Sequence, residues 1–184
     1  MCGVAGCMWA LEGLGVRQED MVLGEVCPEA REQLSKRFPR ATILPHDITS
    51  EAGKRAVAAY KGKVDIVIVA IPCQPSSMAS NVHDSSDVRI GVGQSALEQG
   101  CALLPQLIVV ENVASFTWKQ KEAYAAAHRA VAASFDKVSV LQLDATLCMI
   151  PMYRRRMIMI GSRGPDLNIT TEMVWAQKQF AKGK

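Results

Sequence analysis

Short apolar runs alternate with amphipathic segments along most of the chain. The apolar runs predict strands, and segments with apolar residues three or four positions apart predict the helices between them. The expected strands lie within residues 21–26, 41–49, 65–71, 106–113, 137–143 and 157–161, and the expected helices cover residues 29–38, 51–60, 94–104 and 118–134. Because strands and helices alternate, the pattern predicts an α/β fold with a mostly parallel, doubly wound sheet.

The run at 65–71 has the sequence DIVIVAI, which predicts a strand buried on both faces. Pro72 ends this strand because it has no N–H group to donate to a neighbouring strand. Cys73 follows directly, at the carboxyl end of a strand, where open α/β sheets bind their ligands. A free cysteine is more often a small buried apolar residue. Here the prolines at 72 and 75 restrict the backbone around the thiol, which favours a positioned nucleophile.

Length and composition indicate one folded domain over residues 1–184. Hydrophobic residues make up 49% of the chain and charged residues 21%, and the net charge of +3 does not by itself indicate a nucleic-acid partner. The six cysteines form no Cys-x-x-Cys pair and no metal-ligand spacing with the three histidines, so we expect reduced thiols and no metal. No apolar run approaches the roughly 20 residues of a membrane helix, so we expect no membrane partner and a cytoplasmic location.

Glycines and acidic residues near the expected strand ends are typical of a nucleotide-type ligand site. Gly3 and Gly6 precede a helical pattern, and such a glycine turn directs helix N–H groups towards a ligand. Glu25 ends the next strand about twenty residues later, an arrangement that binds ribose hydroxyls. Asp47 follows a further strand in the same way. A solvent-facing Glu25 and an Asp47 that only caps a helix are the alternative interpretations.

Three further features are expected near the same edge of the sheet. The segment 76–93 is long, polar and contains glycine, which is typical of a functional loop that closes over a substrate. Glu111 ends the strand next to that of Cys73, where a buried carboxyl group can hold a proton. Three arginines at 154–156 precede a strand, either as a solvated patch or as ligands of a phosphate or base carbonyl.

Together these motifs resemble the catalytic domain of the cytosine-5 DNA methyltransferases, from Met1 to about Arg163. The family's Pro-Pro-Cys-Gln motif resembles residues 71–77 (IPCQPSS), and its Glu-Asn-Val motif is intact at 111–113; these two are specific. The less specific similarities are the opening glycine motif at 1–6 (MCGVAG), the ribose-binding Glu25, the Asp-Ile pair at 47–48 and the Gln-x-Arg-x-Arg motif at 152–156 (MYRRR).

The resemblance implies a Rossmann-like enzyme that transfers a methyl group from S-adenosylmethionine to carbon 5 of cytosine in DNA through a covalent Cys73 adduct. In this family pattern the catalytic residues are Cys73, Glu111, Arg154 and Arg156. The implied cofactor-binding residues are Met1, Gly3, Val4, Gly6, Glu25, Val26, Asp47, Ile48 and Pro72. The implied substrate-binding residues are Gln74, Ser77, Arg89 and Asn112.

Departures from the family pattern remove no reacting group, although Ala5, Ile71, Ser76 and Met152 replace the family's Gly, Pro, Phe and Gln. The first strand of the family's sheet and its target-recognition domain are missing from the match. We therefore expect a truncated enzyme or one subunit of a divided enzyme, which self-associates or pairs with a second polypeptide that supplies target recognition. Its expected setting is a bacterial or phage-type cytoplasm or the nucleoid, as in restriction–modification.

Two other functions stay open. A degenerate family member would bind nucleic acid, cofactor or a partner without turnover, and the altered glycine turn favours that interpretation. A thiol hydrolase is less favoured, because His83 and His128 lie in segments that do not place them beside Cys73. The motifs fit RNA as well as DNA as the substrate.

Overall fold

The computed structural model describes residues 6–72, 88–148 and 152–164. Its helices are α1 (Gly6–Gly13), α2 (Pro28–Arg37), α3 (Glu51–Ala58), α4 (Val88–Ala102), α5 (Phe116–Lys119) and α6 (Lys121–Ser134), with 3-10 helices η1 (Gln18–Asp20) and η3 (Ala145–Cys148). Its strands are β1 (Val22–Gly24), β2 (Thr42–Leu44), β3 (Ile66–Ala70), β4 (Leu107–Val113), β5 (Lys137–Asp144) and β6 (Arg155–Ser162). Within these residues, no helix is long and apolar enough to cross a membrane.

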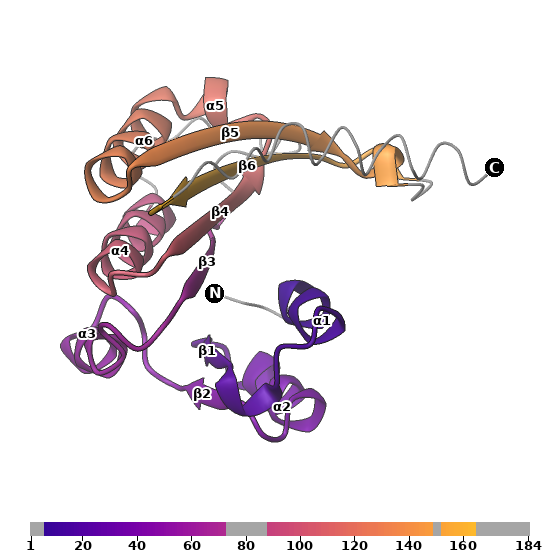
Figure 1. Ribbon diagram of the computed structural model, residues 1–184, viewed down its shortest axis with the longest axis vertical. Helices are drawn as coiled ribbons and strands as arrows, with labels where there is room; N and C mark the ends of the chain where they lie inside the picture. Colours follow the sequence, from indigo (N-terminus) through magenta and orange to yellow (C-terminus); the bar gives the residue numbers. More distant parts are fainter. Residues whose placement is uncertain (1–5, 73–87, 149–151, 165–184) are drawn as a thin grey trace.

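The strands form two separate sheets (Figure 1). The small sheet pairs β1 with β2 in parallel, and the larger sheet has the strand order β3-β4-β6-β5. In the larger sheet β3 is parallel to β4, whereas β6 is antiparallel to both β4 and β5. Strands β3, β4 and β5 therefore point in one direction and only β6 is reversed. The predicted α/β fold with mostly parallel strands is confirmed.

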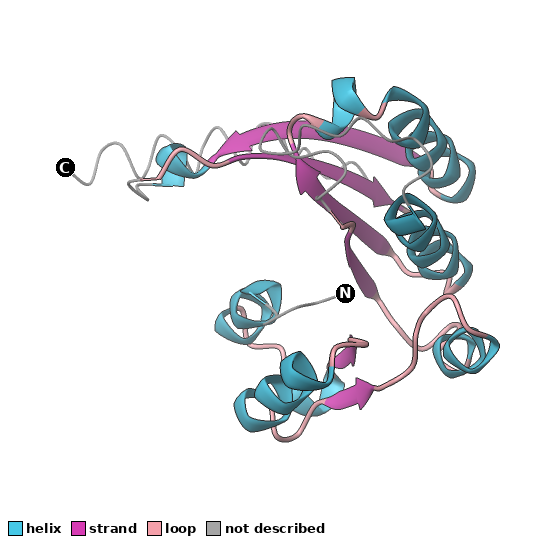
Figure 2. Cartoon of the chain, turned by 180° about the vertical axis from the view of Figure 1, so that it is seen from behind, coloured by secondary structure: helices cyan, strands magenta, loops and turns pink. Residues whose placement is uncertain are grey.

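Helices α4 and α6 cover one face of the larger sheet (Figure 2). Alternate residues of a strand point to the same face, and those of β4 and β6 that point to the helices are fully buried: Ile108, Val110, Met157 and Met159. At Gly161 helix α6 lies so close to β6 that a Cβ atom would be 2.6 Å from Val131 Cγ1. A second, smaller core joins the small sheet to α2, and it contains Met21, Leu23, Leu34 and Phe38.

The expected loop at 76–93 was wrong in its extent, because α4 already begins at Val88. The rest of that loop lies outside the described residues. Glycine at 93 suggested irregular structure, but in the fold it lets α4 approach β3. A Cβ atom at Gly93 would lie 2.5 Å from Ile71 Cγ2. Here glycine serves close packing of a helix on a strand.

Two other expectations were corrected by the structure. The strand at 65–71 is not buried on both faces, because in β3 only Val69 is buried and Ile66 is 43% exposed. Among the described strands, β3 lies at the edge of its sheet. The single helix expected over 118–134 is two helices, α5 and α6, which meet at Gln120. Its backbone (φ −122°, ψ 55°) is not helical and separates them.

Candidate functional site

The carboxyl ends of β3 and β4 lie side by side, as the sequence predicted. Ala70 is the register partner of Glu111, and the Ile71 N–H group donates to the Glu111 carbonyl oxygen at 3.2 Å. Pro72 continues from this end of β3. The predicted nucleophile Cys73 follows Pro72 in the sequence and lies outside the described residues.

Several predicted site residues lie outside the described residues. They are the nucleophile, two substrate-binding residues and three cofactor-binding residues: Cys73, Gln74, Ser77, Met1, Gly3 and Val4. Their roles stay predictions from the sequence.

Glu111 and Arg156 form an ion pair between neighbouring strands. Val113 of β4 is the register partner of Arg156 in β6, which puts the two charged side chains diagonally across the antiparallel pair. Arg156 Nε lies 2.7 Å from Glu111 Oε1. Both side chains are partly exposed, by 21% for Arg156 and 34% for Glu111. The expected burial of Glu111 was therefore wrong, because its side chain is on the face of the sheet opposite α4 and α6.

Asn112 points to the other face of β4. It is fully buried among the core residues, and its Oδ1 accepts a hydrogen bond from the Val113 N–H group at 2.7 Å. In the described part of the chain its Nδ2 has no hydrogen-bond partner. The structure therefore does not bring Asn112 together with Glu111, and the substrate contact expected of Asn112 is not supported. Arg89 lies exposed in the first turn of α4.

Glu25 follows the carboxyl end of β1 and is 7% exposed. Its Oε1 accepts hydrogen bonds from the N–H groups of Val26 at 2.9 Å and Cys27 at 3.0 Å, which holds the carboxylate in a fixed position. Arg31 donates to the main-chain oxygens of Glu25, Val26 and Pro45, and so ties the ends of β1 and β2 together. Beside this carboxylate, Val26 is 51% exposed. A solvent-facing Glu25, the alternative interpretation, is wrong.

Asp47 lies between β2 and α3. Its Oδ1 accepts hydrogen bonds from the N–H and hydroxyl groups of Thr49, both at 2.8 Å, and these bonds hold the pKa of Asp47 below its usual value. The helix itself is capped by Ser50, whose hydroxyl accepts from the Gly53 N–H group. Asp47 therefore stabilises the turn, and Ser50 rather than Asp47 is the N-cap.

Ile48 connects the two sheets. Its carbonyl oxygen accepts a hydrogen bond from Gln99 Nε2 of α4 at 2.8 Å, and its side chain packs against the core of the larger sheet. The turn at 47–48 is thereby fixed to the helix that covers β3. It positions the small sheet relative to the strand ends that carry Pro72 and Glu111.

The start of α1 lies close to Glu111. Gly6 is the first residue of α1, and the neighbouring Cys7 is half-buried. Burial raises the pKa of the Cys7 thiol, and the negative charge of Glu111 raises it further. No motif in the sequence identifies Cys7 as a site residue, and its only signal is its place directly after the glycine turn. The glycine end of α1 and the Glu111–Arg156 pair thus belong to one region.

Arg154 and Arg155 precede Arg156 at the start of β6. The Arg154 main chain pairs with the end of β5, since its N–H group donates to Asp144 Oδ1 and its oxygen accepts from the Ala145 N–H group. Its side chain is exposed. Arg155 Nε lies 3.4 Å from Asp144 Oδ2. Only Arg156 of the three arginines contacts Glu111 in the described structure.

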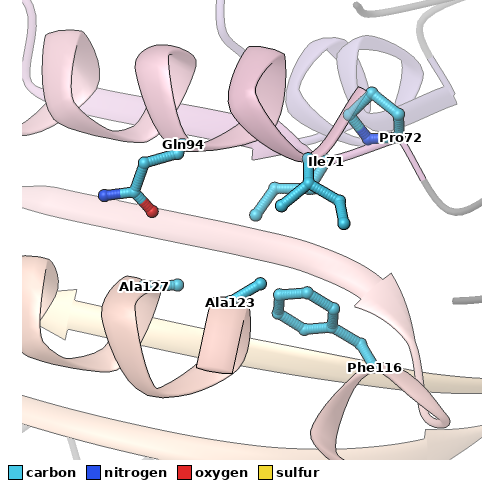
Figure 3. Close-up of a pocket in the computed structure, with 7 residues that line it drawn as sticks. Ile71, Pro72, Gln94, Phe116, Ala123 and Ala127 are labelled. Atoms are coloured by element: carbon cyan, nitrogen blue, oxygen red, sulfur yellow. The ribbon is translucent and has the colours of Figure 1, made fainter. Parts of the chain in front are cut away.

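A small apolar pocket lies on the face of the larger sheet that α4 and α6 cover, opposite the Glu111–Arg156 pair (Figure 3). Ile71, Pro72 and Phe116 line it, together with residues of α4 and α6. It is nearly without polar groups, so it does not suit a charged cofactor or a nucleotide. The described residues contain no group of three or more His, Cys, Asp or Glu side chains that could hold a metal ion.

A family model described as C-5 cytosine-specific DNA methylase matches residues 1–184. Among curated proteins no significant match was found. Solved structures of similar fold include a variant of Spodoptera frugiperda DNMT2 (18% identity, TM-score 0.64, covering 88% of this chain and 48% of that one). Another is S. pombe Dnmt2 methyltransferase (16% identity, TM-score 0.65, covering 89% of this chain and 48% of that one). A third is the Entamoeba histolytica methyltransferase EhMeth (18% identity, TM-score 0.59, covering 78% of this chain and 45% of that one).

These structural similarities confirm the Rossmann-like methyltransferase fold. The chain spans about half the length of the structures that it matches.

Proposed function

Because the chain belongs to the C-5 cytosine-specific DNA methylase family, we propose that it transfers a methyl group from S-adenosylmethionine to carbon 5 of cytosine in DNA. The observation that supports this most is the Glu111–Arg156 ion pair, which lies beside the strand end that leads to Cys73. A carboxyl group and a guanidinium group next to a thiol suit a pyrimidine ring, which offers a nitrogen, a carbonyl oxygen and an electrophilic carbon. We propose that residues 1–184 form one catalytic domain.

The chemistry proposed for these residues is covalent catalysis. The cytosine must leave the base stack, because its reactive carbons are not accessible within it. The Cys73 thiolate forms a bond to carbon 6, and Glu111 holds a proton at ring nitrogen 3 to neutralise the charge that develops there. Arg156 donates hydrogen bonds to the base carbonyl oxygen while it holds Glu111 in place. Carbon 5 would then bond to the methyl group that the cofactor supplies, whose bond to the cofactor's sulfur breaks. Loss of the carbon 5 proton to a base finally breaks the bond between Cys73 and carbon 6 and frees Cys73.

Arg154 would support the extruded nucleotide from the exposed side of β6. Gln74, Ser77 and Arg89 are proposed to bind the substrate. Their place in the chain supports this, because they flank Cys73 or begin the helix that follows it.

The small sheet fits the proposed cofactor. Bound S-adenosylmethionine supplies the methyl group as an electrophile. The fixed Glu25 carboxylate is a suitable acceptor for ribose hydroxyls, and the exposed Val26 side chain offers an apolar surface for a purine ring. Asp47 and Ile48, Pro72 and the glycine turn with Met1, Gly3, Val4 and Gly6 would complete this site.

We also propose that a second polypeptide segment, from a partner or another copy, pairs with the free edge of β3. The Asp65 oxygen accepts from the Leu107 N–H group, and the Ile71 N–H group donates to the Glu111 oxygen. The alternate residues Ile66, Ile68 and Ala70 therefore direct their N–H and C=O groups to the outer edge. No strand in the described part of the chain pairs with that edge. Unpaired edges of this kind favour pairing with another strand. The partner would also supply base-edge contacts, so the chain alone should not methylate a defined sequence.

The test combines cofactor binding with methyl transfer. Calorimetry of the full chain should show binding of S-adenosylmethionine, and labelled donor should transfer its methyl group to cytosine-containing DNA, with or without a candidate partner. Cys73→Ser should abolish transfer and leave cofactor binding intact, whereas Cys101→Ala, in the helix-side core, should keep both. Full transfer by the Cys73→Ser variant would contradict the covalent mechanism. Methylation of one defined motif by a monomer would contradict the partner.

A further inference from the structure

An exposed aromatic residue precedes the three arginines at the start of β6. The β5–β6 hairpin extends beyond the rest of the larger sheet (Figure 1). Tyr153 lies on its returning arm, three residues before Arg156, and is 73% exposed. Neighbouring Met152 is 53% exposed. Tyrosine is typical of surfaces that contact another molecule, because its ring is apolar and its hydroxyl group is polar.

The Tyr153 ring is held in position from one side. The Arg155 guanidinium lies over it, with Cζ 4.9 Å from the ring centroid, and such cation–π contacts are attractive. Asp144 in turn holds Arg155 through Nε at 3.4 Å and accepts the Arg154 N–H group. One face of the ring therefore carries a fixed guanidinium group. The high exposure of the side chain leaves the rest of the ring available to a ligand.

The charges around Tyr153 restrict the kind of ligand. Residues 152–156 carry three arginines and no acidic residue, and the nearby carboxylates of Asp144 and Glu111 are each paired with one of these arginines. Arg154, the residue after Tyr153, also has an exposed side chain. A flat ring stacked on arginine and flanked by a further exposed arginine suits a ligand with flat bases and phosphates. Aromatic residues interleaved with basic ones bind single-stranded nucleic acid in this way.

We propose that Tyr153 and Arg155 form a stacking platform for a base of an unpaired DNA strand, on the opposite face of β6 from the Glu111–Arg156 pair. The choice of DNA rests on the proposed function, but binding of an unpaired strand does not. Stacking is tolerant of sequence, because every base has a flat face. The platform thus retains a strand without reading it. It also favours single-stranded DNA over a continuous duplex, whose bases already stack on one another.

The experiment measures binding of the full chain to a fluorescently labelled single-stranded DNA of about 12 nucleotides, a length within the usual site sizes. Tyr153→Ala should weaken binding about tenfold, the effect of losing one base–aromatic stack. Tyr153→Phe keeps the ring and should bind like the wild type, whereas Tyr153→Leu keeps only apolar bulk and should bind like the alanine variant. Matched controls are Trp118→Ala, an aromatic residue 48% exposed on α5, and Arg129→Ala, an exposed arginine on α6. Both should bind normally.

Three outcomes would overturn the inference. They are a Tyr153→Ala variant that binds within twofold of the wild type, equal losses in the two controls, and wild-type binding to duplex as tight as to the single strand. Binding of RNA but not DNA of the same sequence would overturn the assignment to DNA. The proposed function is judged separately by cofactor binding and methyl transfer. Strand binding that depends on the Tyr153 ring, in a chain without transfer, would support the platform and contradict the enzyme.

Discussion

Replacing Gly93 by alanine should destabilise the fold, whereas the same replacement at Gly91 should stabilise it. Both glycines lie in α4, where alanine gains about 0.5–1 kcal/mol over glycine. A Cβ atom at Gly91 meets nothing within 4 Å, but at Gly93 it would lie 2.5 Å from Ile71 Cγ2. Ile71 is buried and is bonded to the Glu111 carbonyl oxygen, so it cannot yield freely. Overpacking of a core costs about 1–3 kcal/mol. Because the helix gain is common to both variants, this cost is the expected difference between them.

The assay is urea unfolding of the wild type and the two variants, followed by circular dichroism. A change in midpoint at constant slope reports stability alone. In an Ile71→Ala background the Gly93→Ala replacement should no longer destabilise, because the atom that it meets is absent. The reasoning fails if Gly93→Ala is as stable as Gly91→Ala, or if Ile71→Ala does not remove the difference.

Two further predictions concern charged groups. Arg156→Lys keeps the charge but loses the planar donor group, so methyl transfer should fall about 100-fold while cofactor binding is unchanged. The control variant Arg129→Lys should have no effect on transfer. Normal transfer by Arg156→Lys would contradict the role of Arg156. The second concerns Asp47, whose pKa is lowered in the folded state by the Thr49 bonds. The ionised carboxylate therefore stabilises the fold at neutral pH, and this contribution is lost as the pH falls through the folded-state pKa, which lies below the ordinary value of 3.8. The stability advantage of the wild type over Asp47→Asn, measured by urea unfolding between pH 7 and pH 3, should therefore shrink in acid; a constant advantage would contradict this.

The strand ends could be predicted from the sequence because their signals are local. Apolar runs closed by Pro72 and by Glu111 identify two neighbouring strands, and a parallel arrangement places their carboxyl ends together. Side chains alternate between the two faces of a strand, but the sequence does not show which face the helices cover. The face of each residue therefore follows only once the position of α4 and α6 is known. Asn112 was therefore expected at the substrate, although its neighbour Glu111 occupies that face and Asn112 belongs to the core.

Other features depend on contacts that no local pattern contains. Gly93 suggested a loop, because glycine occurs both in turns and where a helix packs closely on a strand. Only the short distance to Ile71 in the structure shows that Gly93 serves close packing. The stack of Arg155 on Tyr153 depends on Asp144, which belongs to the other arm of the hairpin. The sequence showed three adjacent arginines. The structure assigns them to an ion pair with Glu111, a stack on an aromatic ring and an exposed side chain.

The proposed reaction requires groups from both sheets at one point. The proposed cofactor site lies mainly on the small sheet, at Glu25 and Val26, and the proposed chemical groups lie on the larger sheet. Among the described residues Ile48, which is bonded to Gln99, connects the two sheets, and the charge of Glu111 raises the pKa of Cys7 at the start of α1. A methyl donor and its acceptor carbon must meet within about 3–3.5 Å. A strand paired with the free edge of β3 would add main-chain hydrogen bonds to the strand that leads to Cys73, and would so stabilise the reactive arrangement. Pairing and catalysis are thereby expected to be coupled in this protein.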